Sequence, residues 1–118
     1  MKIRSIKKEK QFIPLFNGNQ ELDPSDQIVI NIKSFPTNSQ VSTYKNYKGD
    51  GSGSVELVYR DDIMLMAHVG LIRNLADDDG PIDNGTALSR STNLLLSDLI
   101  AEIRDYLLNT EELDQGEG

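Results

Sequence analysis

The hydrophobic pattern of the chain changes its period at Asp61-Asp62, and this change limits the fold more than any other feature. Before it, apolar and polar residues alternate, most clearly over residues 27–33, as in a half-buried β-strand. After it, apolar residues recur at helical spacing, beginning at Ile63. The sequence therefore predicts an α+β fold, in which a small antiparallel sheet from the N-terminal half packs against two C-terminal helices.

Within this plan we expect two clear strands, at residues 27–33 and 55–59. The first helix is predicted to start at the two carboxylates, which suit an N-cap and the positive end of the helix dipole, and to run for about four turns. Its expected apolar stripe is Ile63, Met66, Ala67, Gly70 and Leu71, widened by Ile72 and Leu75. The final helix is predicted to begin after a cap at Ser91 or Thr92 and to end near Asn109.

The remaining segments are predicted as turns, loops and ends. Residues 34–42 and the pair Asn84-Gly85 are expected to be a loop and a turn, and residues 49–54 a flexible connector or hairpin. The domain boundaries follow from the same pattern. We expect a basic N-terminal arm or lysine-rich edge strand at 1–11, one α+β domain at 12–110 and an acidic disordered tail at 111–118.

Charge and composition exclude several classes of protein. The 118 residues include 12 Lys and Arg against 19 Asp and Glu, a net charge of -7, so we expect no nucleic-acid partner. With no cysteine and one histidine, thiolate metal sites and most histidine relays are excluded. No apolar run reaches the roughly 18 residues of a membrane helix, so we expect no membrane partner.

The charge is divided unevenly along the chain. Residues 1–10 carry five basic side chains against Glu9, a balance of +4, whereas residues 76–118 carry two against eleven acids, a balance of -9. The ends are either solvated or face different neighbours, including other copies of the chain. Apolar residues make up only 37% of the chain, so the core is thin and an oligomer is expected.

Three segments contain residues that can carry chemistry. The acidic loop Asp77–Asn84 could hold a cation, but in an EF-hand register Ile82 stands where glycine is required, which favours a solvated turn. The glycine-rich run at 49–54 leads into a strand, unlike a phosphate-binding loop. His68 has no recognisable partner in the sequence, which favours a structural role. We therefore assign no catalytic, metal or cofactor-binding residue and expect no enzyme.

The candidate interaction surface combines apolar residues of both predicted helices with two lysines near the N-terminus. The apolar residues can serve the core or a partner groove, and the need to cover one small sheet favours the core. Methionines add adaptability to a shared face. The full set is Ile63, Met64, Met66, Leu95, Leu99, Ile103, Lys7 and Lys8.

The segment from Phe12 to Leu22 reads FIPLFNGNQEL and resembles the opening of small proteins from the tail region of tailed bacteriophages. The likeness continues through His68-Val69, Ile72–Leu75, Gly80-Pro81-Ile82, Asn84-Gly85, Leu88 and Leu113-Asp114. This resemblance implies a tail assembly chaperone or minor tail component. It implies contacts with other tail proteins or with copies of itself, in the virion or in the host cytoplasm during assembly. It implies no catalytic residue.

Two alternatives of other classes remain open at this point. One is a small cytoplasmic protein-binding or regulatory module. The other is a carboxylate- and metal-dependent enzyme, with its site between Asp77 and Asp83.

Overall fold

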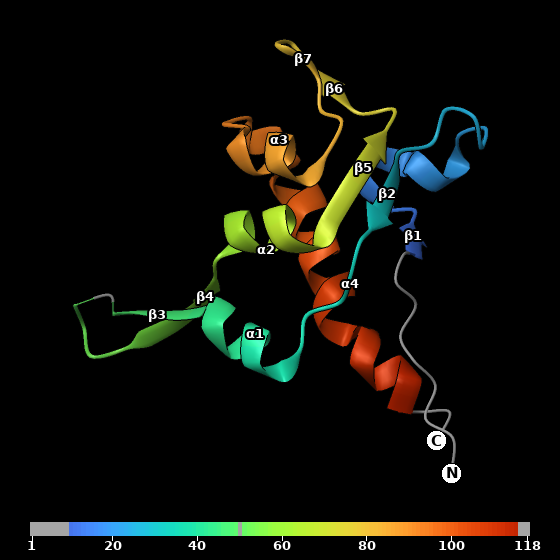
Figure 1. Cartoon of the computed structure of the whole chain (residues 1–118). Coiled ribbons are helices and arrows are strands. Elements are labelled where there is room, and N and C mark those ends of the chain that lie inside the picture. The colour runs from blue at the N-terminus through green and yellow to red at the C-terminus, as the bar shows by residue number, and fades with distance from the viewer. Residues whose placement is uncertain (1–9, 50, 116–118) are drawn as a thin grey trace.

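The centre of the fold is a three-stranded antiparallel sheet (Figure 1). The structure is a computed structural model, and it describes residues 10–49 and 51–115. Because β2 is the middle strand, its side chains lie deepest, and Ile30 and Ile32 are fully buried. The strands are β1 (Lys10–Phe12), β2 (Val29–Ile32) and β5 (Val69–Arg73).

The long helix α4 (Ser97–Gln115) covers this sheet. Leu99, Ile103 and Leu107 recur every four residues and are buried, which is the pattern of one helical face packed on a core. The Tyr106 ring stacks on Phe12 of β1 with centroids 4.3 Å apart. Helices and antiparallel strands thus share one core, which confirms the α+β class.

The expected four-turn helix after Asp61 is wrong in its second half. Helix α2 (Asp61–His68) ends where β5 begins, and Ile72 pairs with Ile30 of β2. Pairing with β2 satisfies the backbone of this segment and outweighs its local helical spacing. The sheet therefore draws one strand from beyond the N-terminal half.

The predicted apolar stripe of that helix is corrected as well. Ile63 and Met66 are partly exposed, whereas Met64, Leu65 and His68 are buried. A helix that ends at His68 is free to rotate its buried face away from the stripe that a longer helix would need. In β5 both Val69 and Ile72 are buried although they are three residues apart, because the pairing with β2 shifts register between Ile30 and Ile32, as at a β-bulge.

Two short helices lie where a loop and a turn were predicted. Helix α1 (Asn38–Tyr44) starts with a capping box, in which Thr37 and Gln40 bond reciprocally. Helix α3 (Gly85–Arg90) starts at Asn84, whose side chain accepts a hydrogen bond from the Ala87 amide over 2.7 Å. Asn84-Gly85 is therefore a helix start rather than a turn.

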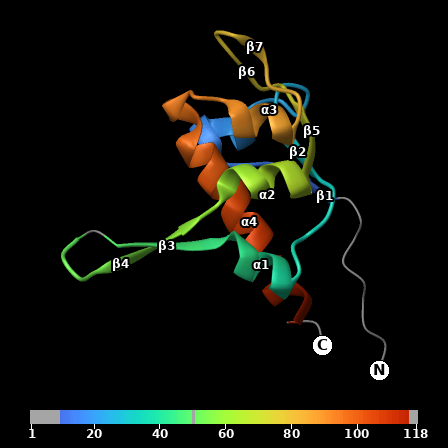
Figure 2. The same ribbon diagram turned by 60° about the vertical axis from the view of Figure 1, so that its left-hand side comes forward.

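Two hairpins and two 3-10 helices complete the fold (Figure 2). The β3–β4 hairpin extends away from the sheet on one side, and the small β6–β7 hairpin extends from another. The bounds are β3 (Lys45–Gly49), β4 (Val55–Tyr59), β6 (Ala76–Asp77), β7 (Gly80–Pro81), η1 (Phe16–Glu21) and η2 (Leu94–Leu96).

The two ends of the chain differ from expectation in one respect. Helix α4 continues past Asn109 to Gln115, which corrects the predicted helix end. The predicted acidic tail at 111–118 stays a prediction. Residues 116–118 lie outside the described residues. At the N-terminal end, β1 begins at Lys10 and lies at the edge of the sheet. Residues 1–9, which belong to the predicted basic N-terminal segment, are outside the described residues.

Candidate interaction site

The β3–β4 hairpin, which we call the arm, projects from the body and carries three exposed apolar side chains. Tyr47 is 63% exposed, Val55 65% and Leu57 40%. Tyr47 pairs with Leu57 and Gly49 with Val55, so these side chains share one face. Figures 1 and 2 both show the arm directed away from the sheet and from α4. The arm therefore offers an apolar face to a partner.

The hydrogen-bond pattern between β3 and β4 shows which backbone N–H and C=O groups of β4 point away from β3. The Arg60 amide donates to the Tyr44 carbonyl over 2.9 Å, next to the first pair of the ladder, so Tyr59 belongs to a pair of the non-hydrogen-bonded type. The two types alternate along an antiparallel ladder. Leu57 and Val55 are thus of the same type as Tyr59. Their N–H and C=O groups point to the outer edge of β4, away from β3.

A buried polar cluster anchors the base of the arm. Tyr44, the last residue of α1, bonds through its hydroxyl to Nε2 of His68 over 2.8 Å. The Oγ atom of Ser34 lies 3.1 Å from Nδ1 of the same ring. Since His68 is buried, the cluster ties the end of α1, the end of α2 and the segment after β2 together. It fixes the direction in which the arm leaves the body.

Burial shifts the ionisation of this cluster. Desolvation lowers the pKa of His68 below its ordinary 6.5, and the nearby positive charge of Lys33 acts in the same direction, whereas hydrogen bonding at Ser34 opposes them. Burial also raises the pKa of the Tyr44 hydroxyl. Both groups are therefore neutral near pH 7, and the ring serves as a hydrogen-bonded core residue rather than a charged one.

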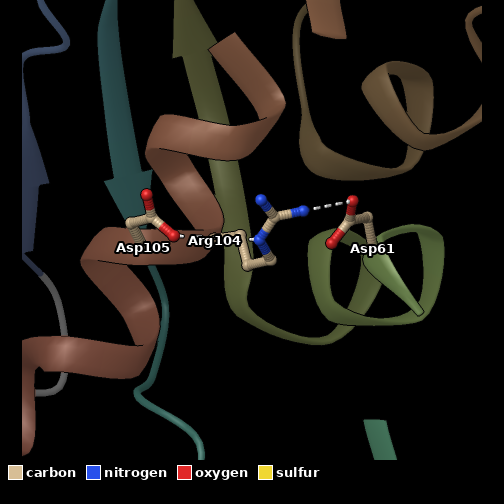
Figure 3. A network of polar contacts seen from close by, with 3 residues as sticks. All are labelled: Asp61, Arg104 and Asp105. Atoms are coloured by element: carbon tan, nitrogen blue, oxygen red, sulfur yellow. Dashed lines mark hydrogen bonds and ion pairs between the residues drawn. The ribbon is translucent and has the colours of Figure 1, made fainter. Parts of the chain in front are cut away.

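An ion pair joins the other side of the base to α4 (Figure 3). Nη1 of Arg104 lies 3.0 Å from Oδ2 of Asp61, and its guanidinium also lies over the Tyr59 ring, 5.7 Å from the centroid. Nε of Arg104 is 3.8 Å from Asp105. Burial raises the pKa of Asp61, although Arg104 lowers it in part. Helix α2 starts at Asp61 as predicted, but its N-cap is Arg60, so the expected carboxylate cap is wrong.

A hollow of about 470 Å³ opens beside this ion pair, between α2, α3 and the start of α4. Asp61, Asp62 and Asp98 are among its lining residues, together with Arg104. Within the described ranges, no three carboxylate or imidazole side chains are grouped closely enough to hold a metal ion. In the acidic loop, Asp77 accepts a hydrogen bond from the Asp79 amide over 2.9 Å, as in a tight turn.

The predicted interaction residues divide into three groups. Met64, Leu99 and Ile103 are buried in the core, so they are not part of a surface. Partner contact is open to the exposed members of the set, which are Ile63, Met66 and Leu95. Lys7 and Lys8 lie outside the described residues.

The hairpin at 49–54 was one of the two predicted alternatives, but its exposed apolar face and the histidine cluster were not predicted from the sequence. The alternation of Val55, Leu57 and Tyr59 correctly predicted a strand, but it gave no sign that two of these side chains stay exposed. The run of glycine and serine at 49–54 was the available signal, because a long flexible turn allows a hairpin to project. The partners of His68 come from segments far apart in the sequence and have no local signature.

Comparison of the chain with protein-family models, with curated proteins and with solved structures finds no match. No helix in the part of the chain that the structure describes is long and apolar enough to cross a membrane. A proposal about function therefore depends on the geometry of the arm, together with the sequence resemblance.

Proposed function

We propose that this protein is a non-enzymatic component of a tailed bacteriophage that acts in tail assembly, or as a structural part of the tail, through protein–protein contacts. The observation that carries the proposal is the apolar face of the arm, formed by Tyr47, Val55 and Leu57. The resemblance of residues 12–22 to small tail-region proteins supports the same assignment.

The arm has only two strands, and this is the physical reason to expect that it binds a partner. An isolated two-stranded hairpin is only marginally stable in water and needs a third strand or a packed face. In the described residues β4 pairs only with β3, and its apolar face is largely open. Burial of that face contributes about 25 cal/mol for each Å² of apolar surface removed from water. A contact at this position therefore stabilises both the arm and the complex.

The partners that this role requires are other tail proteins or copies of the same chain. Lys45 and Lys48 make β3 basic, and an acidic surface on the partner complements them. The sequence of the chain itself is rich in acidic residues over 76–118. The protein would act in the host cytoplasm during assembly and then be released or remain in the virion.

A second candidate function is supported by a separate observation. A hollow of about 290 Å³ lies between α1 and α4, and most of its lining is apolar. Such a hollow is near the lower size of sites that accept small ligands or one anchoring side chain of a peptide. If the protein is a binding module, its ligand would occupy this hollow and the arm would make no contact with it. Its lining residues are Phe35, Pro36, Thr37, Asn38, Val41, Leu107 and Leu108.

The proposal is tested by co-purification with the tail proteins encoded beside the gene. We expect the wild-type chain to retain at least one of them, and the double variant Tyr47→Ser/Leu57→Ser to lose it. Leu94→Ser is the control, because it removes a still more exposed leucine from η2, outside the arm. If none of these proteins is retained, or if both variants bind as the wild type does, the arm is not the assembly surface. Loss of binding on Val41→Asp instead would favour the hollow.

A further inference from the structure

The outer edge of β4 is a strand edge with one charged side chain, Glu56, and with none of the lysine, proline or bulge that most often prevents pairing. Edge strands in natural proteins carry lysine, proline or a bulge that prevents addition of another strand. β3 fits this rule, with Lys45 and Lys48. The other strand reads VELVY and has neither lysine nor proline. Among the described residues no strand other than β3 pairs with β4, so the outward N–H and C=O groups of Val55 and Leu57 can pair with another strand.

We propose that β4 pairs with β4 of a second copy, antiparallel and around a twofold axis at Leu57, to form one four-stranded sheet. This deepens the proposed function and rests on it, since it names the partner of the same arm. Three or more strands with an apolar face reach independent stability where two do not. A twofold contact uses the same patch on both chains, so one exposed edge is sufficient to build it.

The sequence of β4 is self-complementary in this register. Leu57 meets Leu57 of the second copy, and Val55 meets the second copy's Tyr59. These are the residues whose backbone groups point outward, so each pair exchanges two hydrogen bonds. The apolar side chains of both arms then continue across one face of the sheet.

No like charges are directly opposed in this register. Glu56 faces the second copy's Val58, so the two Glu56 carboxylates are not directly opposed, as like charges in a cross-strand pair would be. The second copy's Arg60 and its Glu56 both lie diagonal to Glu56 on the same face, so one opposite and one like charge flank it at similar distance. The described tip residues 51–54 are only glycine and serine, so small side chains meet the start of the second copy's α2.

The occupant could instead be a strand of a different tail protein. A foreign strand would need no self-complementary register, and the pairing of Val55 with Tyr59 and of Leu57 with itself would then have no use. The apolar pairs of this register, Leu57 with Leu57 and Val55 with Tyr59, favour a second copy. The experiment below distinguishes the two.

Cysteine cross-linking tests the twofold axis directly, because the natural chain has no cysteine. In Leu57→Cys the two thiols lie in one hydrogen-bonded pair, with Cα atoms about 5.5 Å apart, which a disulfide can span. Glu56→Cys is the matched control within the same strand, because the register separates its two copies beyond the limit of about 7 Å. We expect mild oxidation to convert Leu57→Cys to a covalent dimer and to leave Glu56→Cys largely monomeric.

Sedimentation of the unmodified chain provides a second, independent measurement. We expect a reversible dimer that dissociates on dilution, loss of that dimer in Leu57→Lys, and its retention in Leu94→Lys. A monomer at every concentration, with equal cross-linking of both cysteine variants, overturns the pairing. If the arm variant Tyr47→Ser/Leu57→Ser then still loses a tail protein, the proposed function stands and the partner strand is foreign. If it loses none, both proposals are wrong.

Discussion

Tyr47 lies directly opposite Leu57 on the β3–β4 arm, and both side chains remain exposed. In a pair of the non-hydrogen-bonded type the side chains are at their closest, so the two form a small continuous apolar surface. The same pairing turns the backbone groups of Leu57 outward. One residue thus contributes both the apolar face and the open edge of the arm, which makes it the centre of the proposed contact.

Removing the apolar face of the arm should weaken self-association while leaving the stability of the fold nearly unchanged. In Tyr47→Ser/Leu57→Ser we expect the free energy of unfolding to change by less than about 1 kcal/mol, because surface substitutions away from the core cost little. Self-association should weaken at least about tenfold, which corresponds to about 1.4 kcal/mol. Chemical denaturation and sedimentation measure the two quantities. A large loss of stability would show instead that the arm belongs to the core.

The hydroxyl of Tyr44 should matter for stability because its partner is buried. Tyr44→Phe leaves Nε2 of His68 without its hydrogen bond, and we expect a loss of about 1–3 kcal/mol in the free energy of unfolding. Tyr47→Phe is the matched control, since its ring is exposed, and should change stability by less than about 0.5 kcal/mol. Equal effects of the two variants in urea denaturation would contradict the assigned cluster.

Stability should fall as the pH is lowered through the range in which free histidine takes up a proton. The pKa of His68 is lowered in the folded state, so the unfolded chain binds the proton first, near its ordinary 6.5. The contribution is fully present above that value and decreases below it, by at most about 1.4 kcal/mol for each pH unit. Denaturation curves between about pH 7.5 and 5.5 measure it.

Protonation of Asp61 changes the stability in the opposite direction to protonation of His68. The two contributions to the pH dependence must therefore be measured separately. Its pKa is raised in the folded state, so its protonation on acidification favours the folded chain, at pH values above its ordinary 3.8. Comparison with His68→Gln removes the histidine contribution and leaves that of Asp61 unchanged. We expect a flatter pH dependence in this variant than in the wild type. Parallel curves would contradict the role given to His68.

Gly85 should tolerate no side chain, because the first turn of α3 lies against the α2–β5 junction. A Cβ atom at this position would clash with the Leu65 carbonyl and would lie 2.6 Å from the Val69 carbonyl, both of which are rigid backbone atoms. We expect Gly85→Ala to cost about 2–4 kcal/mol or to prevent folding. Gly49→Ala is the control, since its nearest neighbour is 4.0 Å away. Thermal unfolding of both variants checks the prediction, and similar melting temperatures would contradict it.

The sequence pattern was sufficient for the elements whose local and tertiary preferences agree. The strands at 29–32 and 55–59, the start of α2 and the buried face of α4 at Leu99 and Ile103 follow from periodicity alone. Periodicity does not predict a strand whose formation depends on pairing with an adjacent strand. Residues 69–73 have helical spacing, yet they pair with β2 because the central strand needs a partner on that side.

The site was less predictable than the fold for two physical reasons. Exposure depends on what covers a strand, so VELVY reads the same in a core and on a projecting arm. The hydrogen bonds of His68 join residues 24 and 34 positions away, and such long-range pairs leave no trace in local spacing. The short helices α1 and α3 were missed although their capping residues, Thr37 and Asn84, are present in the sequence.

Hydrogen exchange of the arm amides, followed across protein concentration, tests the central claim most directly. The Val58 amide is bonded within the arm and should be protected at every concentration, whereas that of Leu57 faces outward in a single chain. The proposed pairing predicts that Leu57 gains protection as the concentration rises and loses it on dilution, while Val58 does not change. Rapid exchange at Leu57 at every concentration, with Val58 protected throughout, would contradict the claim that β4 pairs with a second copy.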